Sequence, residues 1–178
     1  MRKRWRRIGR LFRRFTAERR GATAIEFAIL AFPFLAFCGA LTETGLMYFT
    51  ESVLDQSVSD AARLIKTGQA QNSSMSVDDF KSAVCDKMFD LFDCSNKIYV
   101  DSQVLASFAD ASTALPLDAD GNLLTSTSFN VGSTSQIVEV RIFLPWTRLL
   151  GLLPVSGSVG ANGTILLNAT AIFRNEPF

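Results

Sequence analysis

The sequence predicts an α+β protein: a long N-terminal transmembrane helix that continues into a small extracytoplasmic domain with a second helix and an antiparallel sheet of three to four strands. Three observations predict it. A basic stretch, residues 1–21, precedes an apolar run of twenty residues. Apolar residues then recur with helical spacing. Three β-branched or aromatic runs follow in the second half of the 178-residue chain, which has room for one modest domain beside a membrane segment.

The first 21 residues are predicted to be a basic cytoplasmic leader. They carry ten of the 18 basic residues and one of the 17 acidic residues, so the net charge of +1 hides two oppositely charged parts. Trp5 and Phe12 among the basic residues also fit a nucleic-acid contact. Beside a spanning helix, binding to anionic lipid explains the same residues better, because each Lys or Arg contributes about 1 kcal/mol of attraction to the membrane surface. We therefore predict membrane lipid, and no nucleic acid, as a partner.

Residues 22–45 are predicted to form a single transmembrane helix. Residues 22–41 contain one charge, Glu26, and are long enough to cross a hydrocarbon core of about 30 Å. A buried core helix would not follow ten basic residues, and a secretory signal has a shorter apolar region. The positive-inside rule places the leader in the cytoplasm and residues 46–178 outside it.

Glu26 is the most unusual residue of the apolar run. A carboxylate in bilayer hydrocarbon costs about 2.5–3.5 kcal/mol, so it requires a partner or a function. The alternative is that Glu26 lies shallow enough for its carboxylate to reach the headgroups. Gly21 ends the basic leader five residues earlier. Because glycine has no Cβ, it lets a peptidase approach the backbone closely and suits the residue before a scissile bond.

The stretch RRGATAIEFAIL, residues 19–30, resembles the cleavage region of type IV prepilins. It is most similar to the TadE/TadG-like pseudopilins of tight-adherence (Flp) pilus systems, whose segments pair a glutamate with an aromatic residue, here Glu26 and Phe27. The resemblance continues through LTETGLMYFTESVLDQSVSDAARLIKTGQAQ and is specific over residues 19–70. It implies a pilin-like fold in the bacterial inner membrane, with a periplasmic C-terminal domain.

The resemblance also implies how the chain is processed. A prepilin peptidase, an aspartyl protease, would cut between Gly21 and Ala22, which makes the chain a substrate. The new Ala22 amine would lie within about one helical turn of Glu26 and supply a counter-charge. Glu26 and Phe27 would then contact other pilins or pseudopilins and the inner-membrane assembly proteins. The alternative is an uncleaved, bitopic periplasmic scaffold or binding protein in which Gly21 and Glu26 are coincidental.

Beyond the membrane the helix is expected to continue over residues 46–67 and to stop at Gly68, before a polar linker at residues 69–75. Its expected apolar face comprises Leu46, Phe49, Val53, Leu54, Ser57, Val58, Ala61, Ala62 and Ile65. Ser76 and Asp79 resemble a capping box that opens a second helix over residues 76–92. The inner face of that helix is expected to contain Phe80, Val84, Met88, Leu91 and Phe92.

Cys85 and Cys94 are predicted to form a disulfide outside the cytoplasm, because no further ligand cluster favours a metal site. Such a short loop contributes about 2–3 kcal/mol; a buried free pair is the alternative. Strands are predicted near residues 97–104, 137–144 and 164–173, with a shorter edge run near 129–131. The sequence leaves three roles open for the apolar stretch 145–154: to cover the core, to touch the membrane or to contact another subunit.

The predicted function is interaction in pilus assembly, and we predict no enzyme, no catalytic residue, no cofactor and no metal. The chain contains no histidine, which removes the commonest general base, the commonest zinc ligand and the usual Ser-His and Cys-His pairs. An anchored extracytoplasmic hydrolase is a further hypothesis. The sequence shows no nucleophile elbow, HExxH motif or phosphate-binding loop that would support it.

Overall fold

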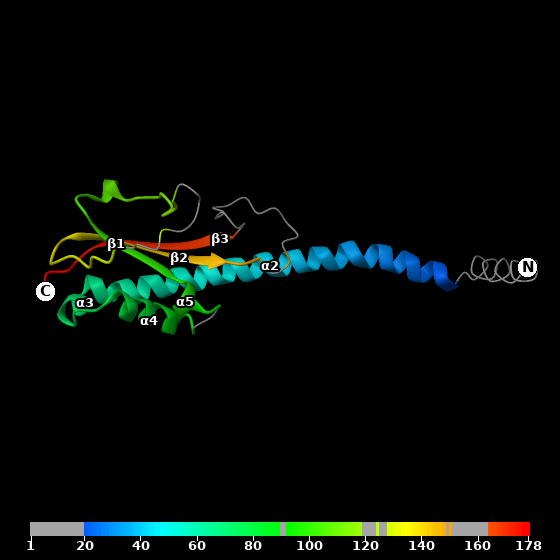
Figure 1. Cartoon of the computed structure of the whole chain (residues 1–178), viewed down its shortest axis with the longest axis horizontal. Coiled ribbons are helices and arrows are strands. Elements are labelled where there is room, and N and C mark those ends of the chain that lie inside the picture. The colour runs from blue at the N-terminus through cyan, green and yellow to red at the C-terminus, as the bar shows by residue number, and fades with distance from the viewer. Residues whose placement is uncertain (1–19, 90–91, 119–123, 125–127, 149, 151–163) are drawn as a thin grey trace, which may run out of the picture. The chain divides into compact units, whose positions relative to one another are not determined.

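The computed structural model describes residues 20–89, 92–118, 124, 128–148, 150 and 164–178. Its first element, α2, runs over Arg20–Lys66. The chain divides within this helix into two compact units, residues 1–42 and 43–178, and each is described by itself. The element order confirms the predicted α+β class, with a long apolar N-terminal helix, further helices and an antiparallel sheet (Figure 1).

In the first unit, the described residues form the N-terminal half of α2, with Pro33 inside the helix. Large apolar side chains project from all around it and are mostly exposed: Ile25, Phe27, Ile29, Leu30, Phe32, Phe34, Leu35, Phe37 and Leu41. By length and composition the helix Thr23–Lys66 can cross a membrane, with a mean hydropathy of 2.1 over its most apolar 18 residues. Only 6% of that window is buried, which distinguishes it from the core helix of a soluble protein.

The second unit consists of the rest of α2, short helices and one sheet. Its elements are α3 (Gln69–Asn72), α4 (Val77–Lys87), α5 (Cys94–Lys97), β1 (Tyr99–Leu105), the 3₁₀ turn η1 (Phe108–Asp110), β2 (Ile137–Trp146) and β3 (Ile165–Arg174). The strands form one antiparallel sheet in the order β1-β2-β3. Leu105 and Arg174 both pair with Ile137 at one end of β2, whereas Trp146 pairs with Ile165 at the other.

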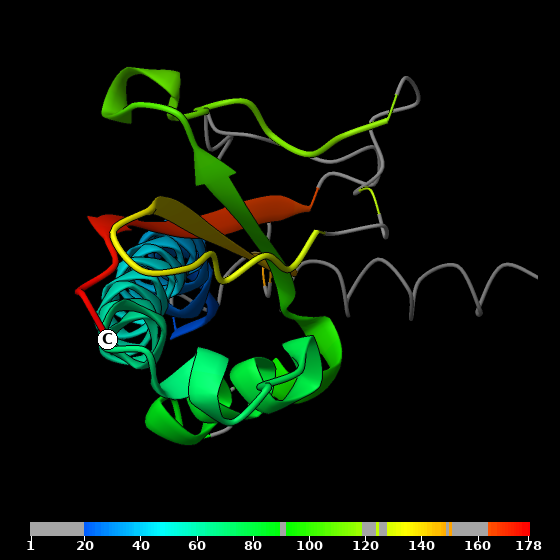
Figure 2. The same ribbon diagram turned by 90° about the vertical axis from the view of Figure 1, so that its left-hand side faces the viewer.

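The core lies between the sheet and the helices. Alternate residues of β2 (Val138, Val140, Ile142, Leu144 and Trp146) pack in one cluster with Leu54, Val58 and Ile65 of α2, with Phe80 and Val84 of α4 and with Met88, which follows α4. Figure 2 shows α2 and α4 on the same face of the sheet. The short run at residues 129–131 adds one bridge, from Phe129 to Ser102, at the edge of β1.

The opposite face of β2 is also covered. Ile137, Glu139, Arg141 and Phe143 are buried there, and the segment 111–115 follows η1 over this face (Figure 2). A strand that is buried on both faces reads as a continuous apolar run, which explains the composition of IVEVRIFL except for its two charges.

The second helix is shorter than the sequence predicted. A capping box of Ser76 and Asp79 begins α4 as expected: the Asp79 amide donates to Ser76 Oγ at 3.1 Å, and the Ser76 amide donates to Asp79 Oδ2 at 3.0 Å. α4 ends at Lys87, not at residue 92. Phe89 and Phe92 have positive φ angles of 55° and 61°, which a continuing right-handed helix excludes. Phe92 is therefore not on an inner helical face, and Leu91 lies outside the described residues.

Two smaller expectations also need correction. The stretch 69–75, predicted as a polar linker, contains the helical turn α3. On α2, Leu46 and Phe49 are exposed, whereas Met47 and Thr50 are buried. The buried positions 47, 50, 54, 58, 61 and 65 follow the three-and-four spacing of one helical face, so the predicted face was displaced in its first turn.

Gly68 stops α2 because of its backbone conformation. Its φ of 79° is in the left-handed region, where glycine carries no Cβ penalty. The Phe178 ring occupies the space that a Cβ at position 68 would need. Nearby, the Glu176 amide donates to the Lys66 carbonyl at 2.9 Å. The C-terminal residues therefore close over the end of α2.

Candidate functional site

The predicted scissile bond, Gly21–Ala22, lies in the first turn of α2, which begins at Arg20. The turn contains no acidic residue to stabilise the helix N-terminus. Glycine also disfavours a helix by about 1 kcal/mol relative to alanine. Gly21 therefore weakens the helix at the predicted scissile bond.

Glu26 follows Ala22 by four residues, and the two therefore lie one turn apart on the same side of α2. The Glu26 side chain is exposed, and Phe27 beside it is 74% exposed. The salt bridges among the described residues join Lys97 to Asp93 and Arg141 to Asp101 and Glu139, and none includes Glu26. The described chain thus presents Gly21, Glu26 and Phe27 outward on consecutive turns, where a peptidase or another helix has access.

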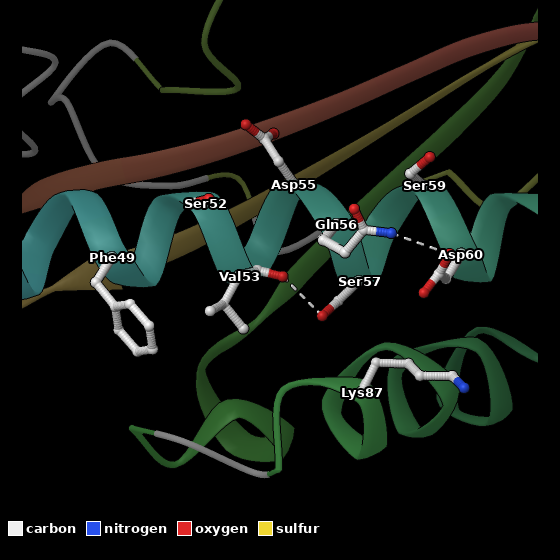
Figure 3. A pocket seen from close by; sticks show the side chains of 9 residues that line it. All are labelled: Phe49, Ser52, Val53, Asp55, Gln56, Ser57, Ser59, Asp60 and Lys87. Atoms are coloured by element: carbon white, nitrogen blue, oxygen red, sulfur yellow. Dashed lines mark hydrogen bonds between the residues drawn. The ribbon is translucent and has the colours of Figure 1, made fainter.

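A groove of about 560 Å³ lies between α2 and α4 in the second unit (Figure 3). Asp55 and Asp60 come from α2 and Lys87 from α4. Three of its polar side chains are already engaged: Gln56 Nε2 donates to Asp60 Oδ1 at 3.2 Å, and Ser57 Oγ donates to the Val53 carbonyl at 2.7 Å. Because the Ser57 hydroxyl bonds to its own helix and no histidine exists in the chain, the groove contains no activated nucleophile of the Ser-His type.

A buried polar cluster on the second face of β2 was missed at the level of sequence. Arg141 Nη2 donates to Asp101 Oδ2 at 2.5 Å, and Arg141 Nη1 donates to the Ala114 carbonyl at 2.7 Å. Glu139 accepts from Gln103 Nε2 at 2.6 Å and from the Ser112 amide at 3.1 Å. These bonds attach the segment 111–115 to the sheet, so the cluster holds the fold together.

The alternation of side chains along the strand was the sequence feature that could have revealed this cluster. Glu139 and Arg141 are the two charges in an otherwise apolar strand, and they share one face because successive strand residues alternate. Asp101 pairs with Arg141 in the register of β1 and β2. The guanidinium is also 5.8 Å from the centre of the Phe143 ring.

Cys85 and Cys94 form a disulfide between the last turn of α4 and the start of α5, with their Cα atoms 5.6 Å apart. The bridge closes a short loop that contains Phe89 and Phe92. Left-handed backbone at non-glycine residues costs about 1 kcal/mol or more each, and Phe89, Phe92 and Asp93 all adopt it. In the part of the chain that the structure describes, no group of three His, Cys, Asp or Glu residues is arranged to hold a metal ion.

One region of the chain is similar to a known protein family. The family model of TadE-like proteins matches residues 21–63. No curated protein and no solved structure matches the chain. TadE-like proteins are structural components of tight-adherence pilus systems. The match begins at the glycine that ends the basic leader and includes the exposed apolar turns around Glu26 and the start of the packed half of α2. Residues 21–63 are thus similar to TadE-like proteins.

Proposed function

We propose that the chain is a pseudopilin-like component that is needed to assemble a tight-adherence pilus. A prepilin peptidase removes the leader after Gly21, and the remaining helix acts in the bacterial inner membrane by packing against the helices of other pilus proteins. The single observation that carries this proposal is the TadE-like match that starts at Gly21 and includes Glu26 in an exposed apolar helix.

Physical chemistry supports a link between cleavage and assembly. The Glu26 carboxylate has no partner among the described residues, and its insertion into hydrocarbon costs about 2.5–3.5 kcal/mol. Cleavage creates an ammonium group at Ala22, one helical turn away in the same subunit and also available to a neighbour. A processed chain therefore gains a counter-charge at this depth that the unprocessed chain lacks.

The domain beyond the membrane favours an assembly role by interaction. Among its described residues, one pocket is an open groove between α2 and α4 and another is a hollow over the polar cluster of β2. Some of the polar groups in each are engaged in bonds within the fold: Gln56, Ser57 and Asp60 in the groove, and Glu139 and Arg141 in the hollow. Such a domain offers a surface to partners, and we propose that it faces the periplasm.

The test of processing is the N-terminal sequence of the protein made together with a prepilin peptidase and recovered from membranes. We expect wild type to begin at Ala22 and Gly21→Leu to retain its leader. Gly45→Leu is a matched control, because a Cβ added at either glycine meets no atom within 4 Å. A wild-type chain that keeps Met1 and still supports pilus assembly would favour an uncleaved scaffold and overturn the proposal.

The test of the carboxylate uses Glu26→Leu. We expect normal membrane insertion and normal cleavage but a strong loss of pili, since leucine removes the charge that pairs with the new amine. Glu51→Leu changes another acid of α2, outside residues 22–45, and should leave piliation unchanged. Normal piliation of Glu26→Leu would disprove the role of this side chain.

A further inference from the structure

The disulfide-closed loop of residues 85–94 exposes its aromatic side chains instead of burying them. Phe89 is 85% exposed, more than Phe32 of the apolar segment at 78%, and Phe92 is also exposed. Both residues adopt left-handed backbone angles that bulky side chains rarely take. The loop is held in this shape by the Cys85–Cys94 bridge. A strained conformation that presents an apolar ring to solvent points to a surface that the ring meets.

The loop lies at one particular end of the globular unit. The Phe92 ring meets the edge of the Trp146 ring, with 5.0 Å between their centres, and Trp146 is the last residue of β2. Four residues later, the Leu150 amide donates to Glu43 Oε1 at 3.1 Å. Figure 1 likewise places α5 and the end of β2 toward the same end of this unit, with α3 and the C-terminus at the other.

Glu43 is the first residue of the globular unit and follows the apolar segment directly. If that segment spans the bilayer, as the proposed function requires, chain connectivity alone keeps Glu43 and its bonded neighbour Leu150 at the membrane surface. Leu150 is itself exposed, as are Tyr48 and Phe49 within two turns of Glu43. We propose that this end of the globular unit, with Phe89, Phe92 and Leu150, rests in the headgroup region of the bilayer.

The chemistry of this end matches a lipid interface. Aromatic and leucine side chains partition into the boundary between headgroups and acyl chains. Between Cys85 and Lys97 the chain carries two lysines and three aspartates, so the loop has no excess positive charge with which to attract anionic headgroups. The insertion therefore depends on apolar burial, and it is expected in zwitterionic lipid and insensitive to salt.

The experiment measures which indoles are in contact with lipid. The full chain is reconstituted in phosphatidylcholine vesicles at a high lipid-to-protein ratio, with bromine atoms placed at different depths on the acyl chains as quenchers. Trp5→Phe silences the leader, and Trp146 remains in every variant as a common background. One phenylalanine is then replaced at a time: Phe89→Trp, Phe34→Trp or Phe108→Trp.

The two companion variants make the outcomes distinguishable. Phe34 is an exposed residue of the apolar segment and reports whether that segment is in lipid. Phe108 is an exposed aromatic residue that follows β1, at the end of the sheet where Leu105 pairs with Ile137, away from Trp146. We expect shallow bromines to quench the indole at position 89 several-fold more than that at position 108. Deep bromines should quench the indole at position 34 most strongly.

Equal, weak quenching at positions 89 and 108 together with deep quenching at position 34 would overturn this inference and leave the spanning helix intact. Weak quenching at position 34 would overturn both this inference and the membrane-spanning helix of the proposed function. An indole at position 89 that responds to the protein concentration and not to bromine would assign the loop to a second protein chain, against our proposal. Leu150→Trp reports on the same end from a separate segment, should Phe89→Trp fail to form the disulfide, and is expected to be quenched like position 89.

Discussion

At the scale of single residues, Arg141 shows how a charge can be buried in a small domain. Its guanidinium binds Asp101 and two carbonyls of the segment 111–115, and its neighbour Glu139 is 1% exposed. A buried ion pair of this kind is strongly destabilised when one partner is removed, because the other charge remains without compensation. Residue type alone did not reveal this, since Glu139 and Arg141 read equally well as the solvent face of a strand.

Arg141→Met is therefore expected to lower the free energy of unfolding by about 3–5 kcal/mol. Lys97→Met is a matched control, because Lys97 pairs with Asp93 at 3.8 Å with both side chains about half exposed. An exposed pair contributes about 0–1 kcal/mol. Urea unfolding of both variants, followed by circular dichroism, measures the difference. Equal effects of the two substitutions would contradict a buried role for Arg141.

The capping box of α4 makes a prediction about pH. The Ser76 side chain and the Ser76 amide donate to the Asp79 carboxylate and lower its pKa. A carboxyl whose pKa is lower in the folded state stabilises the fold above its unfolded pKa of about 3.9, and this contribution is lost as the pH falls through the folded pKa. Asp79→Asn should be less stable than wild type at pH 7, and the difference should shrink below about pH 4.

Unfolding curves of the two proteins between pH 7 and pH 3 would check this. Asp78→Asn serves as a control, because Asp78 is also in the first turn of α4 but outside the box. A stability difference between Asp79→Asn and wild type that is constant across the range would contradict the link to ionisation.

At the scale of elements, the patterns that specify helices and strands were sufficient for most of the fold. The capping box at Ser76 and the three alternating runs predicted α4 and the strands close to where they lie. The second half of the loop 85–94 was not predictable, because apolar spacing continued through Phe92 while the backbone turned left-handed. A disulfide imposes that geometry from outside the local sequence, so helical periodicity alone extends the helix too far.

Removing the disulfide should destabilise the globular unit. Cys85→Ala with Cys94→Ala is expected to lower the free energy of unfolding by about 2–3 kcal/mol, because the unfolded chain is no longer restricted by a short loop. Cys38→Ala changes the free cysteine of α2 and should have little effect. Thermal unfolding in detergent would compare the three proteins, and equal melting temperatures would contradict the prediction.

At the scale of the whole molecule, the charge of the chain is divided between two parts that the proposed cleavage separates. The leader of 21 residues carries ten of the 18 basic and one of the 17 acidic residues. Its removal would change the formal net charge from +1 to −8. The protein that remains would therefore be acidic, whereas the whole chain has an isoelectric point of about 7.7.

Isoelectric focusing of membrane extracts checks this directly. Expression with a prepilin peptidase should move the band from near neutral to clearly acidic pH, and Gly21→Leu should keep it near neutral. A single near-neutral band for wild type in the presence of the peptidase would show that the leader is retained. The candidate site at Gly21, Glu26 and Phe27 could be proposed from sequence because it depends on local order along one helix. The proposed lipid-facing end could not, because it depends on segments that only the fold brings together.

The pairing of β2 with β3 has a mechanical consequence. Ten residue pairs join these strands, and β3 runs from the Glu43 end of the unit toward Lys66, where the Glu176 amide meets the helix. Tension between Glu43 and the C-terminal residues would pull along the strands, so that their hydrogen bonds bear the load together and cannot be unzipped one after another. A subunit tethered at one end and pulled at the other would resist force in this direction better than across it.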